Sequence, residues 1–158
     1  MKKKKNSIKN PGKSVFLIFS IALFTCFFID RIVKFLIMRN FFFGDFFPII
    51  PRVLYFNLAG NSGAAFSMLS GNNTLLIFAS VIAIGFMLFF SKEISKEKWL
   101  SFFSGILAGG ILGNLYDRIF YGFVVDYLDF RFFPIFNLAD SFLTIAAIAL
   151  AVIILKKK

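Results

Sequence analysis

Residues 136–158 read FNLADSFLTIAAIALAVIILKKK, an apolar stretch of helical length that carries one acid, Asp140, near its start. An ionised carboxylate is costly inside a membrane span, so such a residue is a candidate functional group by default. The chain holds only eight acidic residues, and Asp140 is therefore not part of a scattered acidic background. We expect its partner to come from another part of the chain.

Three more apolar runs approach the length of a membrane span. With 59% hydrophobic residues and 26 Phe, the chain is too apolar for a soluble globular protein. We predict one all-α integral membrane domain over residues 1–158, whose basic start is a retained first span because no small-residue cleavage site follows. The four predicted transmembrane helices cover residues 14–38, 74–90, 99–115 and 138–155.

The lysines predict the orientation of these spans. They gather in the N-terminal tail, in the loop at residues 91–99 and at the C-terminus, which should all face the cytoplasm. Both termini are then cytoplasmic. The same distribution argues against nucleic-acid binding despite the net charge of +10, since each cluster flanks an apolar run. The outer segment, residues 39–73, should form short β-strands or an amphipathic element at the bilayer surface.

The composition also limits the chemistry. The chain has no His, which excludes Ser-His and Cys-His nucleophile pairs and any metal site that needs His. Cys26 is the only cysteine and lies in an apolar run, so it reads as a packed thiol. We expect no metal and no cofactor, and catalysis would have to depend on carboxylates.

Polar residues of three predicted spans share one depth. Counted from the cytoplasmic end of each span at about 1.5 Å per residue, Asp140 lies about 22 Å, Asp30 about 25 Å and Asn114 about 24 Å up. In a hydrocarbon core of about 30 Å, this level is just beneath the outer surface. Unrelated surface residues would not be expected to agree so closely.

These polar residues also fall on consistent helix faces. A polar stripe on the last span comprises Asn137, Asp140, Ser141 and Thr144. Asp30 and Lys34 are four residues apart and should form an ion pair that orients or stabilises rather than catalyses. An alternative interpretation of Asp117 and Arg118 is that they anchor a helix end at the membrane interface. Gly105, Gly109 and Gly113 form a stripe that allows another helix to approach closely.

Asp126, in YGFVVDYLDF, is the predicted partner of Asp140, because the segment between them can fold back. Asp129 reads instead as a solvated surface acid. Two nearby carboxylates in a low-dielectric site share one proton, so one can activate a water while the other protonates a carbonyl oxygen. Asn114, Asn137 and Arg118 would hold the water, fix the pair and bind the substrate backbone.

Two other functions also place carboxylates in a membrane. A small transporter would carry them nearer the midplane, where this chain has few charges. A non-catalytic assembly subunit would explain the glycine stripe but not the shared depth of the polar groups. Another class of intramembrane aspartyl protease would show a G-x-G-D motif, which is absent.

Taken together, five motifs resemble those of the lipoprotein signal peptidases, signal peptidase II. They occur in the order of that family and extend over nearly the whole chain after the tail. The motifs are DRIVK with Asp30 and Lys34, NSGAAFSML with Asn61, Gly63 and Phe66, GGILGNLYDRI with Asn114 and Arg118, VVDY with Asp126, and FNLADS with Asn137 and Asp140.

The resemblance implies an aspartic endopeptidase of the bacterial inner membrane, with its active site facing outward. It would cut prolipoproteins just before a cysteine that carries a diacylglyceryl group, in contact with phospholipid and as a monomer. Asp126 and Asp140 would be the catalytic pair, and Arg31 and Gly60 would be permissive positions. The implied supporting or substrate-binding residues are Asp30, Lys34, Asn61, Gly63, Asn114, Arg118 and Asn137.

Overall fold

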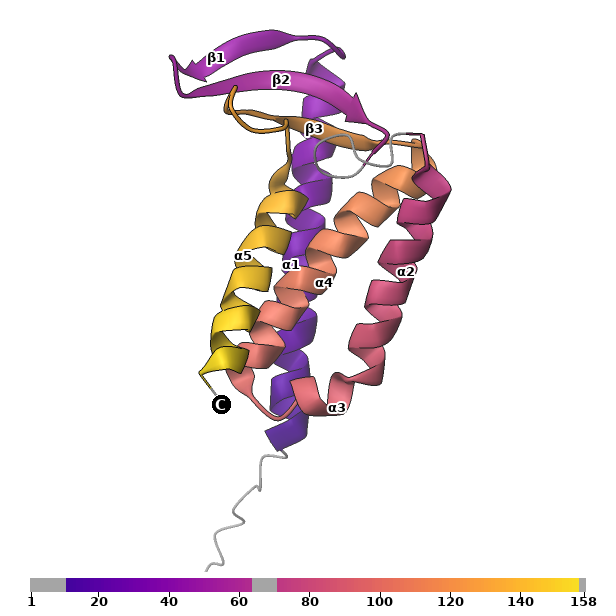
Figure 1. The fold of residues 1–158 in the computed structure, drawn as a ribbon, viewed down its shortest axis with the longest axis vertical. Helices are drawn as coiled ribbons and strands as arrows, with labels where there is room; N and C mark the ends of the chain where they lie inside the picture. The colour runs from indigo at the N-terminus through magenta and orange to yellow at the C-terminus, as the bar shows by residue number, and fades with distance from the viewer. Residues whose placement is uncertain (1–10, 64–70, 157–158) are drawn as a thin grey trace, which may run out of the picture.

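The computed structural model describes residues 11–63 and 71–156, and it has a helical bundle capped at one end by a small sheet (Figure 1). Phe66 lies outside these described residues. The helices are α1 (Pro11–Asn40), α2 (Asn73–Phe89), α3 (Ser91–Ile94), α4 (Lys98–Phe120) and α5 (Leu138–Leu155), and the strands are β1 (Phe46–Ile50), β2 (Leu54–Asn61) and β3 (Val124–Asp129).

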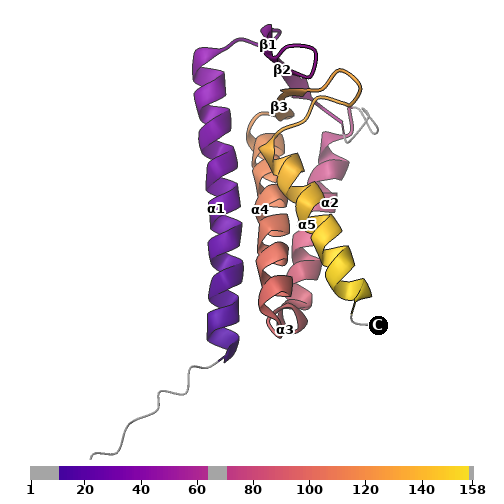
Figure 2. The ribbon, with the colours of Figure 1, turned by 90° about the vertical axis from the view of Figure 1, so that its left-hand side faces the viewer.

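Helix α4 is the centre of the bundle and packs against α1, α2 and α5 (Figure 2). The predicted glycine stripe is the reason for its close contact with α1. A Cβ atom on Gly109 would lie 2.6 Å from the carbonyl oxygen of Leu23, and one on Gly113 would lie 2.7 Å from Asp30 Oδ2. Gly110 faces the other way, against the Ala139 carbonyl of α5. The prediction of close helix packing is confirmed.

The outer surfaces of the helices are apolar. Helix α2 has no buried residue, and the buried residues of α5 are Ala139 and Ala146 only. Large side chains such as Phe24 and Ile148 are exposed, whereas Asp30 and Lys34 are fully buried. This distribution is the reverse of that in a soluble protein, and an apolar outer surface of this kind fits contact with lipid.

Three described helices are long and apolar enough to cross a membrane: Val15–Asn40, Lys98–Phe120 and Leu138–Leu155. They correspond to the first, third and fourth predicted spans, although the third runs five residues further than predicted, which extends it past Asp117 and Arg118. Helix α2 is a shorter apolar helix of 17 residues. The fourth crossing therefore stays a prediction.

The sheet is antiparallel, with strand order β1-β2-β3. Strands β1 and β2 form a hairpin in the segment where short strands were expected. Strand β3 was not expected, so the prediction that β-structure is confined to residues 39–73 is wrong, although the protein is mostly helical as predicted. After α4, Gly122 adopts φ 81° and reverses the chain, and the β-branched pair Val124–Val125 then pairs with the end of β2.

A small core joins the sheet to the helices. Phe56 and Leu58 of β2 pack with Val125 and Tyr127 of β3, and side chains from the end of α1 surround this cluster. Val125 and Tyr127 share one face of β3, so Val124 and Asp126 must point to the other face. Asp126 is thereby directed toward the top of α4 and α5.

Candidate active site

Asp126 and Asp140 open into one cavity of about 900 Å³, at the junction of the sheet with α4 and α5. Asp126 comes from β3 and is buried, while Asp140 comes from the first turn of α5 and is half-buried. The cavity is also lined by Asn61, Gly63, Asn114, Arg118 and the loop from Phe130 to Phe136. Both of the acids that were predicted to pair therefore line the same cavity.

Two asparagine amides hold the carboxylates. Asn137 Nδ2 donates to Asp126 Oδ1 at 2.7 Å, and Asn114 Nδ2 donates to Asp140 Oδ1 at 2.7 Å. The asparagines are themselves connected, because Asn137 Nδ2 lies 3.1 Å from Asn114 Oδ1. Each acid thus keeps an oxygen hydrogen-bonded to a fixed donor, which limits the rotation of both side chains.

The position of Asp140 at a helix N-terminus lowers the cost of placing it near lipid. Asn137 is the N-cap of α5, and its side chain accepts the Asp140 N–H at 3.0 Å, while Asp140 Oδ2 accepts the Asn137 N–H at 3.2 Å. This reciprocal capping box and the positive end of the helix dipole both favour a carboxylate here. In the rest of the predicted stripe, the Ser141 and Thr144 hydroxyls donate to carbonyls of their own helix.

A buried ionic cluster of Asp30, Arg31, Lys34 and Asp117 adjoins the cavity through Asn114. The predicted Asp30–Lys34 pair is present at 3.1 Å, but Lys34 Nζ is closer to Asp117 Oδ2, at 2.7 Å. Arg31 Nη1 lies 2.7 Å from Asp117 and its Nη2 lies 3.0 Å from Asp30. Two cations and two anions balance each other, as a buried ionic group requires.

This cluster is connected to both aspartates of the cavity. Lys34 Nζ donates to Asn114 Oδ1 at 3.1 Å, and Asn114 in turn binds Asp140. Asp117 Oδ2 accepts the N–H of Val125 at 3.2 Å, in the residue directly before Asp126. The cluster therefore fixes α5 and β3 relative to α1 and α4.

Asn61 and Gly63 approach from the end of β2. Asn61 Nδ2 donates to Asp126 Oδ2 at 2.9 Å, and Asn61 Oδ1 accepts the Gly63 N–H at 2.9 Å. Arg118 Nη2 lies 3.4 Å from the Gly63 carbonyl oxygen. Residues predicted from separate motifs are thus gathered around Asp126.

Three readings of single residues were wrong. Asp117 is not an interfacial anchor, because it is fully buried in the ionic cluster. Arg31 is not a permissive position, since it bridges two buried carboxylates and stacks over Tyr116. Asp129 is not a solvated acid, for it is 4% exposed and accepts hydrogen bonds from Asn57 Nδ2 and the Arg131 N–H.

A signal for Asp117 was present in the sequence. Asp117 lies three residues after Asn114 and so shares its helix face. Arg31 lies three residues before Lys34 on the first span, but an arginine near a helix end also fits a surface position. Only the packing of α1 against α4 separates these two readings.

The environment of Asp126 alters its acidity. Burial, followed by the nearby Asp140 carboxylate, raises the pKa of Asp126 to about 7, although hydrogen bonds from Asn61 and Asn137 oppose this rise. A carboxyl group of this kind retains its proton close to neutral pH. A carboxyl group that holds a proton near neutral pH is what general acid catalysis by a carboxyl pair requires.

A model of the family described as signal peptidase (SPase) II matches residues 21–156. The chain belongs to the signal peptidase II family. A lipoprotein signal peptidase of Halothermothrix orenii is 42% identical over 119 residues, which are 75% of this chain and 82% of that protein. The lipoprotein signal peptidase of Trichormus variabilis is 38% identical over 146 residues, 89% of this chain and 90% of the relative.

Two solved structures are similar to the fold, both of bacterial membrane enzymes determined by the in meso method. The structure at 2.3 Å resolution has a TM-score of 0.80 and 32% identity, and covers 91% of this chain and 88% of its own. The structure at 1.9 Å resolution has a TM-score of 0.76 and 33% identity, with coverages of 92% and 95%. The protein is thus a membrane protein.

The family decides between the functions considered from the sequence. Signal peptidase II enzymes are aspartic proteases, and the relatives are named for the removal of lipoprotein signal peptides. This chain is accordingly an aspartic protease that removes signal peptides from lipoproteins, as predicted. The transporter and the assembly subunit are not supported.

Proposed function

We propose that Asp126 and Asp140 are the catalytic pair and that the bond cut is the one before a diacylglyceryl-modified cysteine. The observation that carries this proposal is the meeting of the two acids in one cavity, each held by an asparagine amide. In this proposal Asp126 is the acid, in line with the raised pKa of its buried carboxyl group, and Asp140 is the base.

The reaction then needs no covalent intermediate. A water molecule attacks the scissile carbonyl carbon as its proton passes to Asp140, and Asp126 gives its proton to the carbonyl oxygen. In the second step the C–N bond breaks. The leaving amine takes the proton held by Asp140, and a hydroxyl of the tetrahedral intermediate returns a proton to Asp126. Both acids end in their initial states.

Arg118 is suited to hold the substrate backbone at this cavity. Among the described residues its buried Nε has no hydrogen-bond partner, and its contact with Gly63 is long at 3.4 Å. Guanidinium donors without strong partners can bind carbonyl oxygens of an extended peptide. The apolar loop from Phe130 to Phe136 forms another part of the wall and offers a surface for acyl chains.

We further propose four membrane crossings in the bacterial inner membrane, with both termini in the cytoplasm and the sheet outside. Helix α2 runs beside α4 between the two ends of the bundle (Figures 1 and 2), and Phe90 continues its apolar surface. The start of α1 and the end of α5 lie at the end away from the sheet (Figure 1). In this placement a monomer meets lipid-modified prolipoproteins and phospholipid directly.

The lipid requirement tests the proposed substrate. We expect a precursor peptide with a diacylglyceryl-cysteine to be cleaved with a kcat/KM at least about a hundredfold above that of the same peptide with a free cysteine, because buried acyl chains contribute strongly to binding. The assay uses the purified protein in detergent and follows both peptides by mass spectrometry. Equal cleavage of the two peptides would contradict the proposed specificity.

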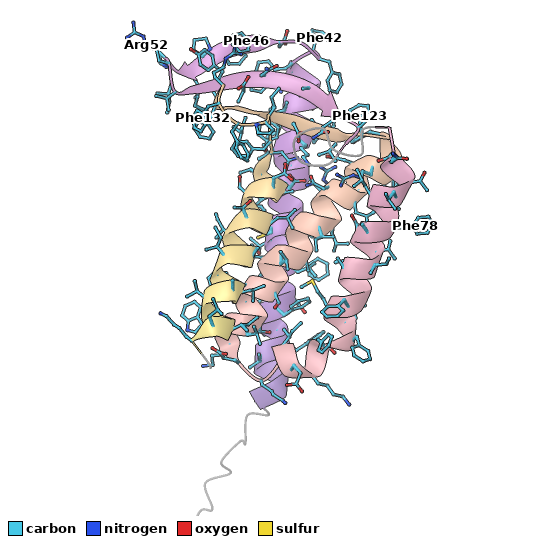
Figure 3. The ribbon with its side chains drawn as sticks, in the orientation of Figure 1. Phe42, Phe46, Arg52, Phe78, Phe123 and Phe132 are labelled. Carbon is cyan, nitrogen blue, oxygen red and sulfur yellow. The ribbon has the colours of Figure 1, made fainter. Side chains whose placement is uncertain are left out.

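Two phenylalanine variants serve as a matched pair in that assay. Phe132 belongs to the cavity loop and is 86% exposed, while Phe78 projects from α2 and is 60% exposed (Figure 3). Phe132→Ala should raise KM for the lipidated peptide by about fivefold through lost apolar contact. Phe78→Ala should leave KM unchanged.

The pH dependence tests the roles of the two acids. Because the active form needs a protonated Asp126, we expect kcat/KM to fall by about tenfold per pH unit above the pKa of about 7. The rate is measured from about pH 5 to pH 9 with the lipidated peptide. Removal of the Asn61 hydrogen bond, which favours the ionised form, should move this falling limb to higher pH in Asn61→Ala. If the falling limb of kcat/KM in Asn61→Ala stays at the same pH, or moves to lower pH, the result would argue against Asp126 as the acid.

A further inference from the structure

The first three N–H groups of α5 all bind side-chain acceptors, and these come from different parts of the fold. Leu138 N–H donates to the Tyr127 hydroxyl of β3 at 3.2 Å, and Ala139 N–H donates to Asp30 Oδ1 of α1 at 3.2 Å. The third, that of Asp140, donates to the N-cap residue. Helix termini leave such groups without partners inside the helix, so these acceptors determine where α5 begins.

Tyr127 is the member of this set with no role so far. It follows Asp126 directly in β3, is 4% exposed, and packs in the cluster with Phe56 and Leu58. Burial raises the pKa of Tyr127, so its hydroxyl remains neutral and accepts the Leu138 hydrogen bond as an uncharged group. Its ring is held by the core of the sheet, and its oxygen reaches the helix.

We propose that Tyr127 is a positioning residue that sets the place of Asp140 through the first residue of α5. The inference rests on the proposed function of the two aspartates. In this arrangement one stretch of β3 determines the positions of both acids. Asp126 is part of the strand, and Asp140 lies two residues beyond Leu138, whose N–H binds the Tyr127 hydroxyl. A shift of the helix start would change the separation of the two carboxylates.

The contact between β3 and the start of α5 does not depend on Tyr127 alone. The backbone N–H groups of Tyr127 and Leu128 both donate to the Phe136 carbonyl, at 3.1 and 2.8 Å, and Phe136 N–H donates to the Leu128 carbonyl at 3.0 Å. These bonds persist when only the hydroxyl is removed. Tyr127→Phe is therefore a local change that keeps the ring in the core and leaves Leu138 N–H without its acceptor.

We expect Tyr127→Phe to lower kcat for the lipidated peptide by about tenfold, because an unpaired donor moves the helix start and misplaces Asp140. The KM should stay within about twofold, since the cavity loop is unchanged. Tyr55→Phe on β2 is the matched control, as its ring stacks on Phe46 in another part of the sheet, and it should retain wild-type kcat. A wild-type kcat for Tyr127→Phe, or a rise in KM alone, would overturn the proposal.

A double-mutant cycle separates the hydrogen bond from the other contacts of the tyrosine. Leu138 is the first helical residue, where proline is well tolerated and supplies no N–H, and Asn137 before it is extended, as a residue preceding proline should be. Leu138→Pro thus removes the donor from the other side. Adding Tyr127→Phe to Leu138→Pro should lower kcat by less than about twofold. If Tyr127→Phe lowers kcat in the Leu138→Pro background as much as it does alone, the proposal would be overturned.

A failure of the Tyr127 proposal can be distinguished from a failure of the proposed catalytic pair. If Asp126→Asn and Asp140→Asn both kept their activity, the catalytic pair would be wrong whatever Tyr127 does. If both variants were inactive while Tyr127→Phe behaved as wild type, the pair would stand and the positioning role alone would fall.

Discussion

Replacement of Asp126 or Asp140 by Asn should lower kcat for a lipidated precursor by about a thousandfold or more. Each substitution keeps the size of the side chain but removes the carboxyl group that takes or gives a proton in the proposed reaction. Asn at position 140 can still accept from Asn114 or from the Asn137 N–H, so the start of α5 should persist. Cleavage is followed by mass spectrometry on purified protein.

Asp129→Asn is the matched control for this experiment. Asp129 is also a buried carboxylate on β3, three residues after Asp126, but it binds Asn57 and Arg131 and does not line the cavity. We expect this variant to retain activity within about threefold of wild type. Thermal unfolding in detergent checks that all three variants are folded. Substantial turnover by either cavity variant would exclude the proposed pair.

Lys34→Met should strongly destabilise the fold, with a loss of about 3–5 kcal/mol. Lys34 is fully buried and contacts Asp30, Asp117 and Asn114 within 3.1 Å. Its removal leaves two buried carboxylates against the single charge of Arg31. We expect a large fall in Tm in detergent, together with loss of activity, because the cluster supports both α5 and β3.

Two further variants make the Lys34 result interpretable. Lys96→Met removes an exposed lysine that pairs with Glu93, and exposed pairs contribute little, so its Tm should not change measurably. Combining Lys34→Met with Asp117→Asn restores a balance of charge between Asp30 and Arg31, and should recover part of the lost stability. A Tm for Lys34→Met equal to wild type would contradict a supporting role of the ionic cluster.

The site could be predicted from the sequence as far as depth and helix face could be computed. Helical rise is constant, so Asp30, Asn114 and Asp140 were assigned one level, and hydrogen bonds now join Asn114 to Asp140 and Asp30 to the start of α5. The family motifs then added Asn61 and Gly63, which composition and spacing could not have placed. Both residues lie at the cavity.

Other features depended on contacts between distant segments. Strand β3 reads as a short apolar run before a loop, and nothing local requires it to pair with β2 rather than continue as a turn. Asp129 could not be recognised as buried, because its partner Asn57 comes from the other strand of that pair. Sequence spacing gives no measure of such pairing.

By itself, the sequence determined that this chain is a membrane protein and predicted acids near one face of the bilayer, because hydropathy, lysine distribution and helical rise are all local properties. The tertiary structure decided which groups meet. Asp117 joins Arg31 and Lys34, and Tyr127 joins Leu138, only because α1, β3 and α5 pack around α4. A buried polar group must find its partner wherever packing brings one within hydrogen-bond distance, and that partner is often far away along the chain.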